Sequence, residues 1–325
     1  MQRRSLALAV LALALAPAVH AQAGATAGFP SKPVRLVVTY PPGGTVDAVA
    51  RILGPRLAQI WGQPVVIDNR AGGGGIIGAQ AVLAAPADGY TLMVDASNHA
   101  QNPALKKRMP FDTLKAFAPV SLMLKVPSVL VVNPNLPVRS PRELIAHVKA
   151  NPGKVDYASS GNGSAQHLAA ELFTLKTGVR MTHVAYRGGG PAMVDVMAGT
   201  VPVFFASLAS SLPYLQSGKL TAVAVAGQRR SPVLPDTPTF TEAGVSGVDV
   251  YEWNALFAPA GMPAGLVEKI SKDVAAALSD RAIKARLMAL GAEVIGSTPS
   301  QLDQFRRAEI NQWTALGKQA NISLD

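Results

Sequence analysis

Three glycine-bearing turns hold the residues whose types and spacing could do chemistry. They span Pro42 to Thr45, Ser160 to Ser164 and Arg187 to Gly190, and each follows an expected strand and opens an expected helix. Glycine lets backbone N–H groups face a ligand without an intervening Cβ atom. A helix start adds unpaired N–H donors and a partial positive charge, which suit a carboxylate or a phosphate. One such turn would indicate tight turning alone, whereas three in one chain indicate a site for an anion.

Nucleotide binding and hydrolysis fit the sequence less well. The run from Gly72 to Gly78 loosely matches the GxGxxG fingerprint, which is weak evidence by itself. The chain contains neither a GxxxxGK[ST] phosphate-binding loop nor a GxSxG nucleophile elbow. A secreted hydrolase or lyase acting on an anionic small molecule stays open as the alternative function. It would need a nucleophile, or a paired acid and base, in the cleft.

The histidines do not predict a metal site. His167 and Glu171 share a helix face at i,i+4, but HExxH and similar spacings are absent. A hydrogen-bonded pair on the helix surface is therefore expected, with no metal and no cofactor. His99 follows a strand and is expected to border the cleft, while His183 lies within a strand and is expected to be structural.

The elements that position the turns alternate between strands and helices. Val34 to Tyr40 is a β-branched run, and from Thr45 the apolar residues fall at helical spacing, with Thr45 as a plausible N-cap and Asp47 in the first turn. The same order recurs several times, which predicts an α/β fold built on mostly parallel sheets. Gly54-Pro55 is expected to bend or interrupt the first helix, for no functional reason that the sequence supplies.

The chain is expected to leave a first lobe, build a second and return. A strand at Tyr251 to Phe257 and three amphipathic helices between Val267 and Ala320 should pack back on the first lobe. The prediction is therefore two lobes, residues 28–124 plus 249–325 and residues 125–248, with a ligand cleft between them.

The N-terminus and the composition predict export. Arg3 and Arg4, the apolar run from Leu6 to Ala16 and the small residues before Gln22 follow the order of a signal peptide over residues 1–21. The apolar run is shorter than the roughly 20 residues of a membrane span. There is no cysteine, which excludes disulfides and thiolate chemistry. The net charge of +10 is scattered and aromatic residues are only 6%, which favours a small anionic ligand over nucleic acid.

Several motifs resemble one family over essentially the whole mature chain and in the same order. The chain is similar to the substrate-binding proteins of tripartite tricarboxylate transporters, the Bug-type receptors. The segments that carry the resemblance are Tyr40 to Asp47, Gln63 to Arg70, Ala87 to Leu92, Tyr157 to Ser164, Leu234 to Thr239 and Ala258 to Gly261.

The resemblance implies a periplasmic, type II-like binding protein of two lobes that closes on a small carboxylate. It further implies no catalysis, delivery of the ligand to integral membrane transporter subunits, and no nucleic-acid partner; we expect a monomer. The expected ligand-binding residues are Tyr40, Gly43, Gly44, Thr45, Asp47, Asn98, Ser160, Asn162, Ser164, Arg187, Gly188, Gly189 and Ser207.

Two departures from the family pattern bear on the ligand. Ala206-Ser207 stands where family members often have an Asp-Asn pair, and Asp95 to Asn98 stands where they often carry a small Ser/Thr-Gly run. The first departure removes a potential acceptor carboxylate. A ligand that bears an amino group is therefore expected to be disfavoured.

Overall fold

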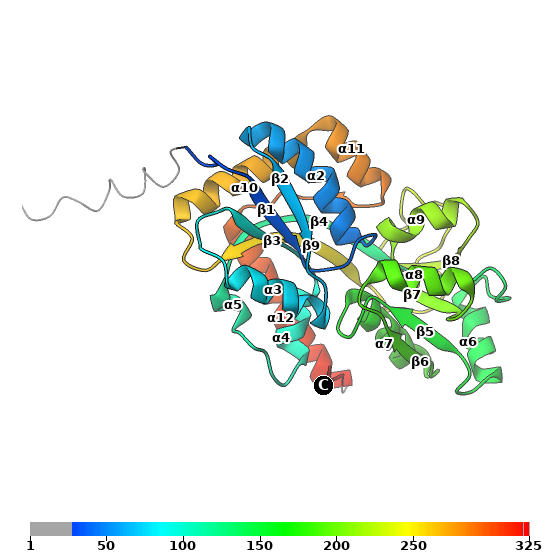
Figure 1. Cartoon of the computed structure of the whole chain (residues 1–325). Coiled ribbons are helices and arrows are strands. Elements are labelled where there is room, and N and C mark those ends of the chain that lie inside the picture. The colour runs from blue at the N-terminus through cyan, green and yellow to red at the C-terminus, as the bar shows by residue number, and fades with distance from the viewer. Residues whose placement is uncertain (1–27, 321, 325) are drawn as a thin grey trace, which may run out of the picture.

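The computed structural model describes residues 28–320 and 322–324, so the signal peptide expected over residues 1–21 lies outside the described residues. Figure 1 shows two halves joined by long strands. The first half begins with strands and helices that alternate up to a long connecting strand. These elements are β1 (Val34–Val38), α2 (Thr45–Trp61), β2 (Val65–Asn69), a 3₁₀ turn η1 (Gly73–Gly75), α3 (Ile76–Leu83), β3 (Thr91–Ala96), α4 (Asn98–Leu105), α5 (Thr113–Ala116) and β4 (Phe117–Val132).

The second half follows β4, and the chain then returns to the first half. The second half contains α6 (Pro141–Ala150), β5 (Asp156–Ser159), α7 (Ala165–Thr177), β6 (Thr182–Ala185), α8 (Gly189–Ala198), β7 (Val203–Ser207), α9 (Leu208–Gln216) and β8 (Thr221–Ala226). The returning elements are β9 (Tyr251–Pro259), α10 (Ala264–Ser279), α11 (Arg281–Ala289), β10 (Glu293–Val294) and α12 (Pro299–Ala320). In the part of the chain with described coordinates, no helix is both long and apolar enough to cross a membrane.

The strands form one mixed sheet with the order β2-β1-β3-β9-β4-β7-β5-β6, while β8 and β10 also pair with β4. The outer strands β1, β2 and β3, and likewise β5, β6 and β7, run parallel to one another. The central pairings of β4 with β7, β8 and β9, and of β3 with β9, are antiparallel. The predicted α/β class is confirmed, and the parallel order holds on both sides of an antiparallel centre.

Alternation along the strands divides the core into layers. Leu36 and Val38 of β1 pack on the side of α2 and α10, whereas Val37 between them packs with Phe257 on the opposite side. In the second half, Phe204 faces the layer of α8 and α9 and its neighbour Phe205 faces that of α6 and α7. Successive strand residues point to opposite faces, so helices cover the sheet on both sides (Figure 1).

The structure differs from the expected elements in two places. Strand β4 begins at Phe117, so the element that crosses the expected lobe boundary at residues 124–125 is one continuous strand. Helix α2 continues through Gly54-Pro55, so the predicted interruption is wrong. A Cβ atom on Gly54 would lie 3.4 Å from the Ile67 side chain of β2, which is an ordinary van der Waals contact.

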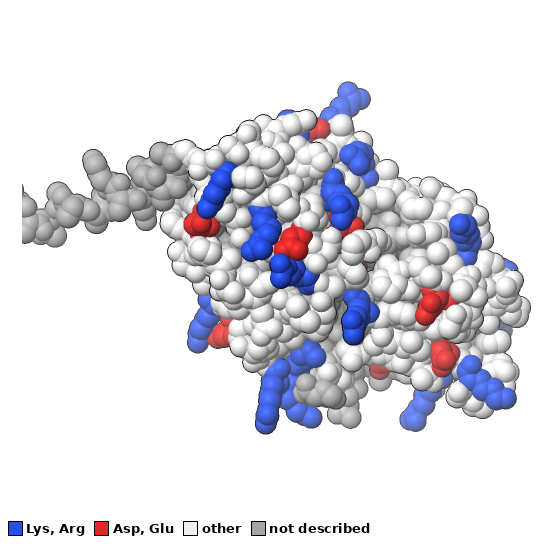
Figure 2. Space-filling model, in the orientation of Figure 1, with Lys and Arg blue, Asp and Glu red and all other residues white. Residues whose placement is uncertain are grey.

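Charged side chains are spread thinly over the surface. On the face drawn in Figure 2, Lys and Arg stand singly or in small groups among acidic and uncharged residues. A protein that tracks a nucleic-acid backbone needs a continuous basic stripe. This face offers none.

Candidate functional site

A small cavity, partly open to solvent, lies between the two halves of the molecule. Five helices begin at its wall, two from the first half and three from the second. The residues at these helix starts are Gly44, Thr45 and Val46 of α2, Ser97 and Asn98 of α4, Ser164, Ala165 and Gln166 of α7, Gly189 of α8, and Ser207 and Ser210 of α9; Tyr40, Ala96, Ser160 and Glu252 complete the lining. Each helix start presents unpaired N–H groups and a partial positive charge. Together they make the cavity favourable for a small anion.

Polar side chains join the two halves across the cavity. The Thr45 hydroxyl donates to the Ser207 Oγ at 2.8 Å, and Asn98 Nδ2 donates to the carbonyl oxygen of Asn162 at 3.3 Å. Tyr40 OH donates to Asn98 Oδ1 at 2.5 Å and so orients that amide. These contacts hold the two walls of the cavity together.

Glycine at the start of α8 allows the second half to meet the turn before α2. A Cβ atom on Gly190 would lie 2.8 Å from the carbonyl oxygen of Pro42, and one on Gly188 would lie 2.7 Å from the Pro41 ring. Both distances are shorter than side chains tolerate in well-packed proteins. The absence of side chains here is a steric requirement of the contact between the halves.

Asp47 was expected to bind ligand, but the structure places it outside the cavity lining. Its carboxylate accepts from the Gly43 N–H at 3.1 Å, from Arg51 Nε at 3.0 Å and from Asn69 Nδ2 at 3.0 Å. Burial would raise the pKa of Asp47, yet the hydrogen bonds from Arg51, Asn69 and Gly43 outweigh it and lower this pKa. Asp47 therefore fixes the turn that presents Gly44 and Thr45.

The structure brings together eight of the thirteen expected site residues. Tyr40, Gly44, Thr45, Asn98, Ser160, Ser164, Gly189 and Ser207 line the cavity. Asn162 and Arg187 lie instead around an adjoining hollow that shares Tyr40 and Ser160 with the cavity. Gly43, Asp47 and Gly188 stand behind the lining. The turns therefore act as units, in which some residues face the cavity and others shape the turn.

Sequence reasoning missed several lining residues, of which Glu252 and Gln166 are the most consequential. Gln166 Nε2 donates to Glu252 Oε2 at 2.8 Å, and this bond also crosses between the halves. Glu252 lies near the start of β9, whereas the glycine turns that predicted the site follow the ends of strands. A signal was present, because Glu252 is the single acid in an otherwise uncharged strand from Tyr251 to Phe257.

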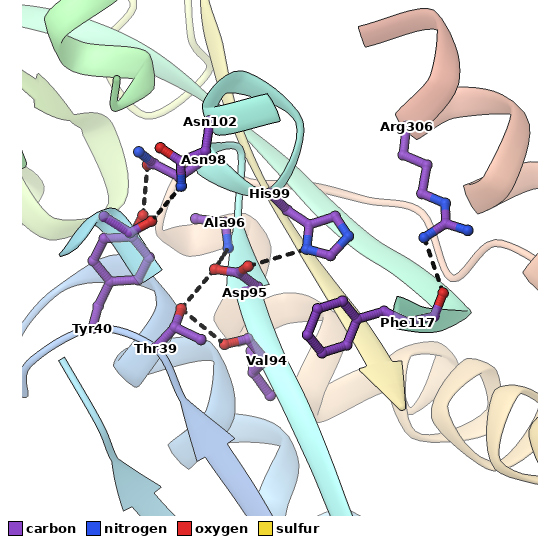
Figure 3. A network of polar contacts seen from close by, with 11 residues as sticks. Thr39, Tyr40, Val94, Asp95, Ala96, Asn98, His99, Asn102, Phe117 and Arg306 are labelled. Atoms are coloured by element: carbon purple, nitrogen blue, oxygen red, sulfur yellow. Dashed lines mark hydrogen bonds and ion pairs between the residues drawn. The ribbon is translucent and has the colours of Figure 1, made fainter. Parts of the chain in front are cut away.

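A buried polar network supports the wall formed by α4 (Figure 3). The Thr39 hydroxyl donates to Asp95 Oδ1 at 2.6 Å, and His99 Nδ1 lies 3.2 Å from Asp95 Oδ2. The His99 ring stacks on Phe257 with centroids 3.8 Å apart, and burial lowers the His99 pKa. His99 does not line the cavity that it was expected to border. It instead anchors the start of α4, and with it Asn98.

His167 and His183 form a second buried cluster, behind the turn from Ser160 to Ser164. Their rings stack with centroids 4.1 Å apart, Gly163 N–H donates to His167 Nδ1 at 3.2 Å, and His167 Nε2 lies 3.7 Å from Glu171 Oε1. Across the residues with described positions, no group of three or more His, Cys, Asp or Glu side chains could hold a metal ion. The two imidazole rings are therefore neutral and support the turn from Ser160 to Ser164 by packing and hydrogen bonding.

Acid is expected to destabilise the protein through this pair. Burial lowers the pKa of His167 and of His183 from 6.5 to about 4. Between pH 6.5 and 4 these rings are therefore protonated in the unfolded chain but neutral in the folded chain. The free energy of unfolding therefore decreases as the pH falls from 6.5 towards 4. His167→Asn keeps an acceptor for Gly163 N–H and should flatten the fall of the melting temperature over this range. His147→Asn, on α6, should leave the profile unchanged, and an equal response of both variants would contradict the assignment.

Comparisons with known proteins agree with the family resemblance of the sequence motifs and with the observed fold. The family described as "Tripartite tricarboxylate transporter family receptor" matches residues 49–322. The Protein BugT of Bordetella pertussis is 36% identical over 319 residues, which is 98% of each chain.

Two solved structures superpose closely. The periplasmic binding protein BugD has a TM-score of 0.88 at 33% identity, covering 91% of this chain and 99% of that one. A Rhodopseudomonas palustris protein solved with adipate has a TM-score of 0.88 at 37% identity, with the same coverage of both chains. The family match and the full-length relative agree with the motifs in the turns, and the chain belongs to the tripartite tricarboxylate transporter family of receptors.

Proposed function

We propose that this protein is an extracytoplasmic receptor that binds a small carboxylate and delivers it to a tripartite tricarboxylate-type membrane transporter. The observation that carries the proposal is the cavity at which five helices begin. Helix starts and hydroxyl groups replace the hydration that a carboxylate loses on burial. The relative solved with adipate, a dicarboxylate, supports the ligand class.

Closure of two lobes is the motion that we propose for capture. Strand β4 pairs with β9 up to Pro127 and with β7 and β8 from Ser128 onward. This change of partners supports lobe boundaries near residues 124–125 and 248–249. Within the described residues, the chain passes between the halves at β4 and around Val250, so a small twist there would open the cavity.

The location and the partners follow from the same proposal. We infer a periplasmic protein, in keeping with the periplasmic relative BugD, that acts as a monomer and meets the membrane subunits of its transporter in the closed, ligand-bound form. The ligand is released there when the lobes open.

A hydrolase or lyase is the alternative, and we propose that the protein is not an enzyme. In the described part of the chain, the cavity lining contains hydroxyl groups and one carboxyl group but no histidine, lysine or arginine. A receptor returns its ligand unchanged. Stoichiometric protein and ligand followed by NMR would show catalytic turnover if the enzyme alternative were right.

Ser160→Ala is expected to weaken carboxylate binding by about tenfold to a hundredfold, the worth of one hydrogen bond to a charged group. Ser160 lines the cavity, and among the described residues its hydroxyl makes no hydrogen bond, so it is available to a ligand. Ser164 is a poorer probe, because its Oγ already accepts from the His167 N–H and caps α7. Titration calorimetry with the best acid from a thermal-shift screen gives the dissociation constant.

The control is Lys149→Ala, at an exposed position on α6 remote from the cavity. Its affinity should equal that of the unaltered protein. A ligand at about 100 times its dissociation constant stabilises a protein by about 2.7 kcal/mol, so binders are readily found. If no carboxylate stabilises the protein, or if Ser160→Ala binds normally, the proposed function or the location of its site is wrong.

A further inference from the structure

Glu252 places a buried carboxyl group inside a cavity suited to an anion. Its side chain comes from β9, it is 7% exposed, and it lines the cavity together with the helix starts. Among the described residues of the lining it is the only one of the types Asp, Glu, Lys, Arg and His. A buried charge needs a partner of opposite charge or a set of hydrogen bonds. The surroundings of Glu252 therefore bear on the chemistry of the ligand.

The protein gives Glu252 several hydrogen bonds but no positive charge. Gln166 Nε2 donates to Oε2 at 2.8 Å and Asn254 Nδ2 donates to Oε1 at 3.3 Å. Burial raises the pKa of Glu252, and hydrogen bonds from Asn254, the Ser207 hydroxyl, Gln166 and the Thr45 hydroxyl offset part of that rise. All four of these groups are neutral. In the described structure no cation pairs with this carboxylate.

Among the described residues, no other ionisable group near the cavity pairs with Glu252, because Arg187 and Lys106 line the adjoining hollow and not the cavity itself. Tyr40 is buried, and its own pKa is raised by burial and by the charges of Asp95 and Glu252. The carboxylate of Asp95 is already held by Thr39 and His99 (Figure 3), and Asp95 does not line the cavity. With Glu252 ionised, the cavity would thus enclose two negative charges when a monocarboxylate is bound. It would enclose three when a dicarboxylate is bound.

We propose, resting on the receptor function above, that Glu252 selects a zwitterionic ligand: a small carboxylate that also carries a protonated nitrogen. The helix starts hold the ligand's carboxylate, and Glu252 accepts from its N–H groups. An ammonium group supplies both the hydrogen bond and the positive charge that Glu252 lacks, whereas a hydroxyl group supplies only the bond. The acceptor that Ala206-Ser207 fails to provide is supplied from β9 instead. The expectation that an amino group is disfavoured is replaced by its opposite.

The test is a binding screen of matched acids that differ by one ammonium group. The pairs are alanine with propanoate, 4-aminobutanoate with butanoate, aspartate with succinate, and piperidine-carboxylate with cyclohexane-carboxylate. The amino member of the best-binding pair should bind at least tenfold tighter than its partner. Glu252→Gln should weaken that amino member by about tenfold to a hundredfold and change its partner by less than about threefold.

Two controls distinguish loss of the Glu252 charge from unfolding of the variant. Glutamine is isosteric with glutamate and still accepts from Gln166, so circular dichroism and melting should show a folded variant. Glu293→Gln removes one negative charge from the exposed position on β10 and should bind every probe normally.

Three outcomes are informative in different ways. If a dicarboxylate binds best, with proton uptake detected by calorimetry in buffers of different ionisation enthalpy, Glu252 acts as a neutral acid and the selectivity proposal is overturned. If Glu252→Gln leaves the preference between paired acids unchanged, the proposal is also overturned. If no acid of either kind binds, the receptor function itself has failed, because that result does not depend on Glu252.

Discussion

Gly190→Ala is expected to weaken ligand binding by roughly 5- to 150-fold while leaving the protein folded. The new Cβ atom would lie 2.8 Å from the carbonyl oxygen of Pro42 in the other half of the molecule, so it opposes closure. Overpacking of this kind costs about 1–3 kcal/mol, which corresponds to that change in affinity. In the open form that we propose, the same methyl group would meet no opposing wall. Alanine also favours a helix over glycine, so the ligand-free protein should melt at the same temperature or higher.

A matched control is available within α2. Gly54→Ala makes the same substitution in a helix away from the cavity, where the added Cβ lies 3.4 Å from Ile67 and is in ordinary contact. Its affinity should be unchanged. Titration calorimetry measures both variants, and small-angle scattering with and without ligand reports compaction. Normal affinity and normal compaction in Gly190→Ala would show that the halves do not close on the ligand as proposed.

Arg306→Met is expected to lower the free energy of unfolding by about 2–5 kcal/mol, because it leaves buried acceptors without a hydrogen-bond donor. Arg306 is 2% exposed, and it joins α12 to the segment that enters β4. Nη1 donates to the carbonyl oxygen of Phe117 at 3.1 Å (Figure 3). Nη2 donates to the carbonyl oxygen of Leu114 at 3.3 Å. Its Nε donates to Asp303 at 2.8 Å. Methionine fills similar space but has no N–H groups.

Arg307 is the matched control for this variant. It contacts the same carboxylate, with Nε 2.7 Å from Asp303 Oδ2, but its side chain is 53% exposed. Exposed ion pairs contribute about 0–1 kcal/mol, so Arg307→Met should change stability little. Urea unfolding of both variants gives the difference. Equal effects would mean that Arg306 contributes only its ion pair and not its bonds to the backbone.

The sequence predicted the elements whose pattern is local. The turn before Thr45 and those that end at Ser164 and Gly190 were all placed between a strand and a helix, because glycine content and the change of hydrophobic period are visible within a few residues. Five lining residues followed from these turns, namely Gly44, Thr45, Ser160, Ser164 and Gly189. The structure of Gly43 to Asp47 shows the limit of that reasoning, since neighbours in one turn face in different directions.

The parts that sequence reasoning missed depend on contacts between distant segments. The first part of β4 contains Pro119 and Pro127, which oppose a strand prediction, yet β9 pairs along it at those positions. Glu252 reaches the cavity only because β9 lies between β3 and β4. His99 was assigned to the cleft from its place after β3, but its stacking on Phe257 of β9 draws it into the core.

The position of β9 also has a consequence for how the chain acquires its structure. In the sheet, β9 separates β3 from β4, although it follows β4 by more than a hundred residues in sequence. The first half therefore cannot complete its hydrogen-bond ladder until the segment at Tyr251–Pro259 is available. Such non-local pairing slows folding, because a long loop must close before its contacts form. During synthesis from the N-terminus, the first half should thus stay incompletely folded until late. The second half can form earlier, because its strands apart from β4 all lie between Asp156 and Ala226.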